Sequence, residues 1–187
     1  MTRHLGTSTR NRLRAWAVAA ASLLALGSAT AVAPPAGAEV AALTCTVNVQ
    51  LSFSPSLTAV QTTASVVAVA SLSNCLSPDG SHPHLAGGTA SPVSGTVTSL
   101  GGIPCNLLLT ITGSGTIEWS PGDERTAFDF TVRTNVLDGT VQLTTWQTAG
   151  TLAGTTSQTV GVANPNLDCL LNGLSGLAVP VALTTFL

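Results

Sequence analysis

Hydrophobic and polar residues alternate one by one along several short stretches of the chain. In the stretch Thr44–Phe53 every odd-numbered residue is apolar, and the even-numbered residues are Thr, Asn, Gln and Ser. Side chains of a β-strand point to opposite faces with a period of two, so this pattern predicts a strand with one buried and one solvated face.

The largest apolar side chains of this alternating pattern lie between residues 115 and 133. Two strands are predicted here, at Gly115–Ser120 and Thr126–Arg133, joined by the turn-forming residues 121–124. The large apolar residues expected on their common buried face are Ile117, Trp119, Phe128, Phe130 and Val132. Because each buried aromatic ring covers about 150–250 Å², we expect this face to be the centre of the core.

Six more strands complete the pattern. They are predicted at Ala64–Leu72, Val93–Leu100, Leu107–Thr112, Gly139–Trp146, Ser157–Val162 and Val179–Leu187. Short strands at regular intervals, separated by turn residues, indicate a single all-β domain. We therefore predict one antiparallel β-sandwich, immunoglobulin-like or barrel-like, of about nine strands.

Two of these strands and one turn carry a more specific prediction. Ala64–Leu72 has valines on both faces, which is typical of a central strand covered on both sides. A turn is expected at residues 113–114, between two separate strands. In the last strand Val179, Val181 and Leu183 alternate, with Pro180 on the outward side, and this proline indicates that the strand begins at a sheet edge.

The first 38 residues have the features of an export signal. Four arginines precede a nearly continuous apolar run at 15–33, and Pro34-Pro35 is followed by the small-residue cleavage pattern Ala36-Gly37-Ala38. The alternative is a membrane anchor, since nineteen residues can just span a bilayer. We predict a secretory signal peptide at 1–38 and a secreted β domain at 39–187.

Removal of this leader changes the charge of the protein. Four of the six arginines lie within it and all eight acidic residues lie beyond it, so the net charge of residues 39–187 is 2 − 8 = −6. Two cationic side chains cannot neutralise a row of phosphates. Nucleic acid is therefore not expected as a partner, and neither is an anionic membrane surface.

All four cysteines lie in the predicted secreted domain. An even number in an exported chain indicates two disulfides, for which three connectivities exist. An antiparallel hairpin formed by the first two strands brings Cys45 beside Cys75, which leaves Cys105 to pair with Cys169. Zinc is the rival interpretation, but no two cysteines have the spacing of two to four residues that is common in structural zinc sites.

These features together resemble a known group of proteins. The export leader, the four cysteines, the run Gly113–Ser120 with Trp119, the strand with Phe128 and Phe130, and the Thr-rich last strand are similar to small, uncharacterised secreted all-β proteins of actinobacteria. The resemblance implies an exported β-sandwich in a Gram-positive bacterium. It implies no activity and no site residues.

One loop holds the most suggestive polar cluster, formed by Asp79, His82 and His84. Two imidazoles and a carboxylate can hold a divalent metal or form a pH-sensitive patch. The alternative is a solvated loop, which we favour because histidines two residues apart around a proline match no metal motif. No metal and no cofactor is assigned.

Two catalytic arrangements are weaker. Hydrolysis by a serine nucleophile would need a Gly-x-Ser-x-Gly elbow and an independently placed histidine, and the chain has neither. Glu118 and Asp129, expected on facing strands, are a possible carboxylate pair for glycoside cleavage, but both also belong to the polar face of their strands.

Trp146 is the most unusual residue of the sheet. Its register places it with Gln142 and Thr144, opposite Val141 and Leu143, which predicts an exposed indole. Such a side chain can stack on a sugar or anchor a protein partner, because tryptophan is enriched at interaction hot spots. A covered second face or a β-bulge would bury it instead.

The sequence favours a non-catalytic binding module, at the cell surface or in the medium, which recognises a glycan or a protein. The alternatives are a secreted enzyme or enzyme inhibitor with its polar centre at Asp79, His82 and His84, and a structural protein that assembles through sheet edges.

Overall fold

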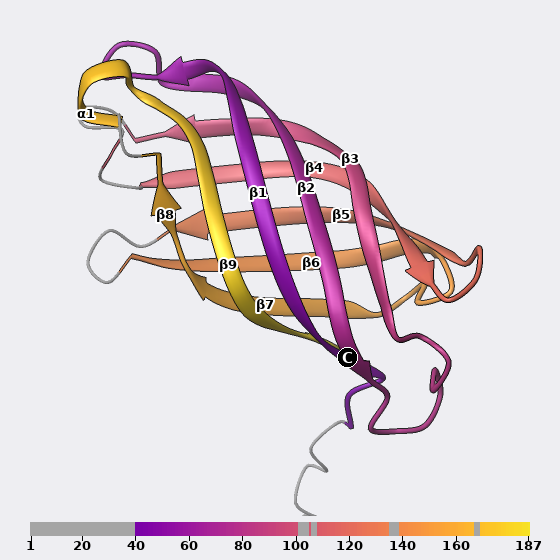
Figure 1. Ribbon diagram of the computed structural model, residues 1–187. Coiled ribbons are helices and arrows are strands. Elements are labelled where there is room, and N and C mark those ends of the chain that lie inside the picture. The colour runs from indigo at the N-terminus through magenta and orange to yellow at the C-terminus, as the bar shows by residue number, and fades with distance from the viewer. Residues whose placement is uncertain (1–39, 101–104, 106–107, 135–138, 167–168) are drawn as a thin grey trace, which may run out of the picture. The chain divides into compact units, whose positions relative to one another are not determined.

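The computed structural model describes residues 40–100, 105, 108–134, 139–166 and 169–187. The chain separates into two units, 1–37 and 38–187. The predicted signal peptide lies outside the described residues, and the second unit contains all of the elements in Figure 1.

Nine strands and one short helix make up the described fold. They are β1 Leu43–Leu57, β2 Thr63–Leu76, β3 Gly87–Ser99, β4 Leu109–Ser120, β5 Arg125–Thr134, β6 Thr140–Gly150, β7 Thr156–Val162, β8 Asn164–Pro165, α1 Cys169–Asn172 and β9 Leu174–Phe186. The prediction of an all-β protein with about nine antiparallel strands is confirmed.

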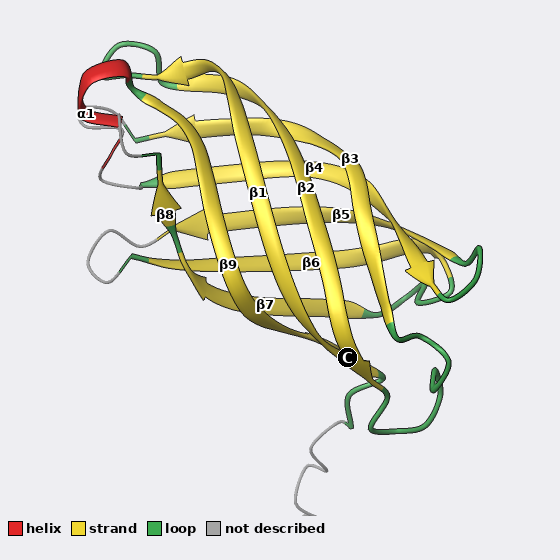
Figure 2. Ribbon diagram, in the orientation of Figure 1, coloured by secondary structure: helices red, strands yellow, loops and turns green. Residues whose placement is uncertain are grey.

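The strands close into a barrel. Each of β1 to β6 pairs antiparallel with the next strand along the chain, β7 pairs with β9, and β9 pairs back with β1. The short β8 pairs only with β9, so eight strands form the barrel wall and one is additional. Of the two forms named above, the barrel is correct and a two-sheet sandwich is not. Figure 2 shows the loops gathered at the two ends of the barrel.

Alternation decides which side chains enter the barrel. In β5 the residues Phe128, Phe130 and Val132 are buried, whereas Asp129 and Arg133 between and beyond them are exposed. Trp119 of β4 is also buried, and its indole N–H donates a hydrogen bond to Thr126 Oγ1 at 2.8 Å. The predicted core face of β4 and β5 is therefore confirmed.

The predicted turn at residues 113–114 is wrong, because β4 runs without interruption from Leu109 to Ser120. Gly113 lies opposite Gly95 of β3 and Phe130 of β5. A Cβ atom on Gly113 would stand 2.2 Å from the carbonyl oxygen of Ser94 and 2.8 Å from the Phe130 ring. This glycine lets neighbouring groups approach the strand closely; it does not end the strand.

The prediction that β2 is covered on both faces is also wrong. Val66 and Ala68 point inward and are buried, but Val67 and Val69 point outward and are 55% and 47% exposed. The wall of a barrel is a single layer, and no element of the described residues covers the outer side of β2.

The last strand differs most from its prediction. Val47 of β1 pairs with Ala182 and Val49 pairs with Val179, so Pro180 and Val181 together oppose the single residue Asn48. This is a β-bulge, with Val181 at a φ of +46°. The extra residue reverses the alternation: Val181 and Leu183 point outward and are 75% and 61% exposed, although the sequence placed them inside.

The bulge does not make β9 an edge strand. β9 has β1 on one side and β7 and β8 on the other, so the prediction of an edge at Pro180 is wrong. Proline has no N–H to donate to a ladder, and the bulge is the place within a paired strand where this loss is tolerated.

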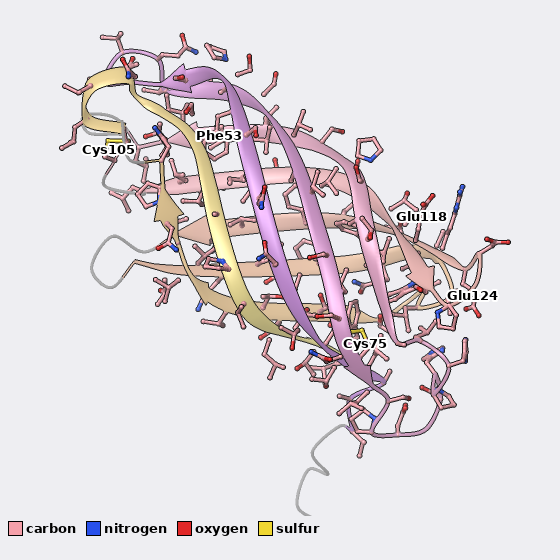
Figure 3. The ribbon with its side chains drawn as sticks, viewed as in Figure 1. Phe53, Cys75, Cys105, Glu118 and Glu124 are labelled. Carbon is pink, nitrogen blue, oxygen red and sulfur yellow. A yellow bond between two sulfur atoms is a disulfide. The ribbon has the colours of Figure 1, made fainter. Side chains whose placement is uncertain are left out.

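Both predicted disulfides are present, Cys45–Cys75 and Cys105–Cys169. Figure 3 shows Cys75 and Cys105 at opposite ends of the barrel. The first bridge joins β1 to β2, as the hairpin argument requires. The second links the connection that precedes β4 to α1.

Candidate functional site

Trp146 lies on the outer face of the barrel, as its register predicted. Its neighbours along β6, Thr145 and Gln147, point inward and are buried, whereas the Trp146 side chain is 46% exposed. Its partners across the ladders are Asp129 of β5 and Thr156 of β7. The alternative that a second layer or a bulge buries Trp146 is therefore wrong.

A groove runs along the outer face of β5 and β6 beside this indole. Its volume is about 260 Å³, and it is lined by Thr131, Arg133, Gln142, Thr144 and Trp146. Thr131 faces Thr144 across the ladder, and Arg133 faces Gln142. The two cross-strand pairs and the indole thus lie next to one another and form one continuous polar and aromatic surface.

The side chains of the groove are equipped for hydrogen bonding. Arg133 presents a planar guanidinium with five N–H donors, Gln142 offers both a donor and an acceptor, and each threonine hydroxyl can do either. Among the described residues the ion pairs are Glu118–Arg125 and His84–Glu124, so Arg133 has no carboxylate partner there.

The inner side of β6 is held in place by a buried polar network. Thr145 Oγ1 and Ser157 Oγ are hydrogen-bonded at 2.7 Å, and Gln147 Nε2 donates to the same threonine oxygen. Thr155 Oγ1 donates to Gln147 Oε1 at 3.2 Å. Because a buried amide has strong directional preferences, this network fixes the orientation of the strand that presents Trp146.

The loop with Asp79 and the two histidines is organised by its own hydrogen bonds. Asp79 Oδ1 accepts from the backbone N–H of Ser81 at 2.9 Å, from the Ser81 hydroxyl at 2.7 Å and from the Ser77 hydroxyl at 3.1 Å. The backbone bond from Ser81, followed by its hydroxyl, holds the pKa of Asp79 below its ordinary value. The Asp79 carboxylate therefore stabilises the conformation of its own loop.

The sequence grouped His84 with Asp79, but the His84 ring is hydrogen-bonded to Glu124. Its Nε2 lies 2.8 Å from Glu124 Oε1 on the β4–β5 turn, while Thr151 Oγ1 donates to Glu124 Oε2 at 2.8 Å. The Thr151 hydroxyl, followed by His84, lowers the pKa of Glu124. In the part of the chain that the structure describes, no three His, Cys, Asp or Glu side chains form a possible metal site. The contacts of Asp79 and His84 therefore go to separate partners.

The carboxylate pair expected on facing strands does not form. Glu118 lies opposite Arg125 and is bonded to it at 2.8 Å, whereas Asp129 lies opposite Ser114. Four residues along β4 separate positions 114 and 118, which is about 13 Å at the rise of a strand. Glycoside hydrolysis by two carboxylates requires a separation of at most about 9.5 Å. Figure 3 shows Glu118 at the same end of the barrel as Glu124.

Comparisons of the chain with protein-family models, with curated proteins and with solved structures return no match. Among the described residues, no helix is long and apolar enough to cross a membrane. The candidate site therefore rests on its own geometry.

Sequence reasoning found Trp146, Gln142 and Thr144 on one face but missed Thr131 and Arg133 beside them. The missing information was the register between β5 and β6. The number of residues between the two strands does not by itself fix this register, so the pairs Thr131–Thr144 and Arg133–Gln142 could not be counted out from the turn.

Proposed function

We propose that this protein is an exported, non-catalytic binding protein that recognises a glycan through the Trp146 groove. The observation that carries the proposal is the exposed indole of Trp146 beside the open groove. A flat aromatic face can stack on the apolar face of a sugar ring, with the ring's hydroxyl groups directed to the polar side chains next to it.

The composition of the groove favours a glycan over an apolar partner. Apart from Trp146, its lining is Thr131, Arg133, Gln142 and Thr144, all of which make hydrogen bonds. A site built to pair with hydroxyl groups discriminates against molecules that lack them, because its polar groups would then be left unpaired. The guanidinium of Arg133 adds an affinity for sugars that carry a carboxylate, such as uronic acids.

Binding without turnover fits the same lining. The groove contains no histidine, and Asp129, opposite Trp146, is the nearest cross-strand carboxylate. Glycoside cleavage by acid and base needs two carboxyl groups, so one carboxylate beside an indole fits recognition better.

Two observations support export. The first 38 residues have the pattern of a signal peptide. The two disulfides belong to an oxidising compartment, because thiols are kept reduced in the cytosol. We place the protein in the medium or at the cell wall, where glycans are abundant.

Assembly through sheet edges receives less support. β-Strands associate between molecules when one side of a strand is unpaired. Each of the eight wall strands has a neighbour on both sides, and the additional β8 is only two residues long.

The proposal is tested by measuring depletion of the protein from solution by insoluble chitin, cellulose, xylan and peptidoglycan. Soluble oligosaccharides, neutral and uronic, are then used as competitors. We expect at least one of these polymers to retain the wild-type protein. Trp146→Ala should weaken retention by about 30-fold or more, the size of a hot-spot loss of 2 kcal/mol.

Val67→Ala is the matched control, because Val67 is an exposed apolar residue on β2, a strand that does not contribute to the groove. Its retention should equal that of wild type. Equal retention of Trp146→Ala and wild type on every polymer would exclude the groove as the glycan site.

A further inference from the structure

Four aliphatic side chains lie together on the outer face of β7 and β9. All of them are more than half exposed: Val160 58%, Val162 60%, Val181 75% and Leu183 61%. Val160 and Leu183 are direct partners across the ladder. Exposed aliphatic groups that together cover a few hundred Å² are uncommon in soluble proteins and commonly mark an interaction site.

The other two valines lie just beyond the last paired position of the two strands. A Cβ atom on Gly161 would stand 3.1 Å from the Cβ atom of Ala182, so β7 still lies against β9 at this point. The same antiparallel register then places Val162 opposite Val181. The four residues form a compact group of two cross-strand pairs, which we call the β7–β9 patch.

The backbone of Val181 is strained, because its φ is +46°. β-Branched residues rarely adopt this conformation, whereas glycine adopts it freely. Valine at this position therefore lowers the stability of an isolated molecule and also exposes an apolar side chain. Backbone strain of this kind is concentrated at functional sites. A partner that covers the Val181 side chain would account for both features.

The charged side chains of the described strands lie away from this patch. They are Glu118 on β4 and Arg125, Asp129 and Arg133 on β5. In the closed order of the barrel wall, β4 is the fourth strand from β9 in either direction, so the patch lies opposite β4. The neighbouring strands β7, β9, β1 and β2 carry no charged residue.

These features favour a second copy of the chain as the occupant of the patch. Around a two-fold axis each patch meets an identical one, and two uncharged patches meet without like charges facing each other. The charged groups of β4 and β5 stay outside such an interface, although residues 39–187 have a net charge of 2 − 8 = −6. A lipid surface fits less well, because membrane-surface segments use basic and aromatic side chains, which the outer faces of β7 and β9 lack.

We infer that the protein forms a homodimer in which the β7–β9 patch of one copy packs against the same patch of a second copy. The patch supplies the apolar centre of the interface. Uncharged polar residues next to it supply the rim, namely Thr46 and Asn48 of β1, Gln158 of β7 and Thr185 of β9. A standard interface buries about 800 Å² on each partner. The patch alone is smaller than this, so the dimer dissociates in the micromolar range or above.

The interface is separate from the Trp146 groove, which lies on β5 and β6. The two surfaces adjoin at one ladder pair, Gln142 of the groove and Val160 of the patch. Self-association through the patch requires no ligand in the groove, so it can be measured on the protein alone.

The test is sedimentation equilibrium of the purified protein over a series of concentrations from micromolar to millimolar. We expect a reversible monomer–dimer equilibrium for wild type. Leu183→Glu places a carboxylate at the centre of each patch and should weaken dimerisation by about 30-fold or more, the size of a hot-spot loss. Thr112→Glu is the matched control, because it adds the same charge at an exposed position of β4, on the opposite side of the barrel. It should dimerise like wild type.

Val181→Gly separates the interface from the fold. Glycine suits the backbone at this position, so dilute monomeric protein should be at least as stable to urea as wild type. Dimerisation should nevertheless weaken about tenfold or more, because the dimer loses two buried valine side chains.

Three results would overturn the inference. The first is a wild-type protein that stays monomeric at every concentration. The second is a Leu183→Glu variant that dimerises as well as wild type. The third is a monomeric wild type that floats with phosphatidylcholine vesicles while Leu183→Glu does not, which would assign the patch to a lipid surface.

Discussion

At the scale of single residues, Glu124 connects three separate segments of one barrel end. It lies on the β4–β5 turn and accepts a hydrogen bond from Thr151 on the β6–β7 connection. Its other oxygen lies beside His84 of the β2–β3 loop. Because these partners favour the ionised carboxylate, the pKa of Glu124 is lower in the folded protein than its ordinary value of 4.5.

This lowered pKa predicts the pH dependence of stability. A carboxyl group with a depressed pKa in the folded state stabilises the protein above its unfolded pKa and loses that contribution as the pH falls through the folded value. Thr151→Val removes the largest cause of the shift, so the pKa of Glu124 should rise towards 4.5. The difference in free energy of unfolding between wild type and variant should be present at pH 6 and vanish in strong acid.

Carboxyl ¹³C NMR of Glu124 measures this pKa directly, and urea unfolding at several pH values measures the stability. Thr148→Val, at an exposed position near the end of β6, is the control and should change neither. An unchanged Glu124 pKa in Thr151→Val would show that the hydrogen bond has no electrostatic effect.

The outward position of Trp146 could be predicted from the sequence, since it follows from local alternation alone. The partner of His84 could not, because forty residues separate it from Glu124 and only tertiary structure brings them together. The opposition of Arg133 and Gln142 depends on strand register, which alternation does not determine.

At the scale of elements, the bulge in β9 is the feature that decides which residues face outward. Local alternation placed Val181 inside with Val179, and it could not reveal an inserted residue. Pro180 was assigned to a sheet edge, whereas it lies in a bulge of a strand that is paired on both sides. The difference depends on whether a partner strand continues past the proline, which only the closed pairing with β1 establishes.

The bulge predicts opposite behaviour for two nearby valines. Val179 is buried at 4% exposure, so Val179→Ala should cost about 2 kcal/mol through two lost methyl groups and the space they leave. Val181 is exposed and has a positive φ, where an L-residue is strained by roughly 1–2 kcal/mol. Val181→Gly should therefore be as stable as wild type or more stable.

Urea unfolding of the two variants checks this prediction. A Val181→Gly protein destabilised as much as Val179→Ala would place Val181 inside the barrel and contradict the bulge.

At the scale of the whole molecule, closure of the barrel could not be predicted from the strands alone. Nine amphipathic strands are equally compatible with a sandwich and with a barrel, because both architectures bury one face of each strand. The pairing of β9 with β1 distinguishes the two, and it joins residues 117 to 143 positions apart. The disulfides were predictable because the first bridge lies across a local hairpin and the second follows by elimination.

The two bridges should contribute unequally to stability. They span sequence separations of 30 and 64 residues. The chain-entropy relation assigns them about 3.6 and about 4.3 kcal/mol respectively. Replacing Cys105 and Cys169 together by serine should therefore lower the free energy of unfolding slightly more than replacing Cys45 and Cys75, as measured by urea unfolding. The reverse order would show that native-state effects outweigh loop closure.

Export is tested by the intact mass of the protein secreted into the medium. A mass that matches residues 39–187 less four hydrogens, with thiols that can be alkylated only after reduction, is expected. A retained leader or freely reactive thiols would contradict the secreted, disulfide-bonded form.

The central claim is that Trp146 forms the ligand site on the outer face. The most direct measurement is ¹⁹F NMR of protein labelled with 5-fluorotryptophan, in the presence of soluble fragments of the glycan that retains it. The domain has two tryptophans, of which Trp119 is buried at 2% exposure and hydrogen-bonded to Thr126. We predict that only the Trp146 signal, assigned by Trp146→Phe, shifts saturably with added glycan. A Trp146 signal that does not move while the glycan binds would place the site elsewhere and contradict the account.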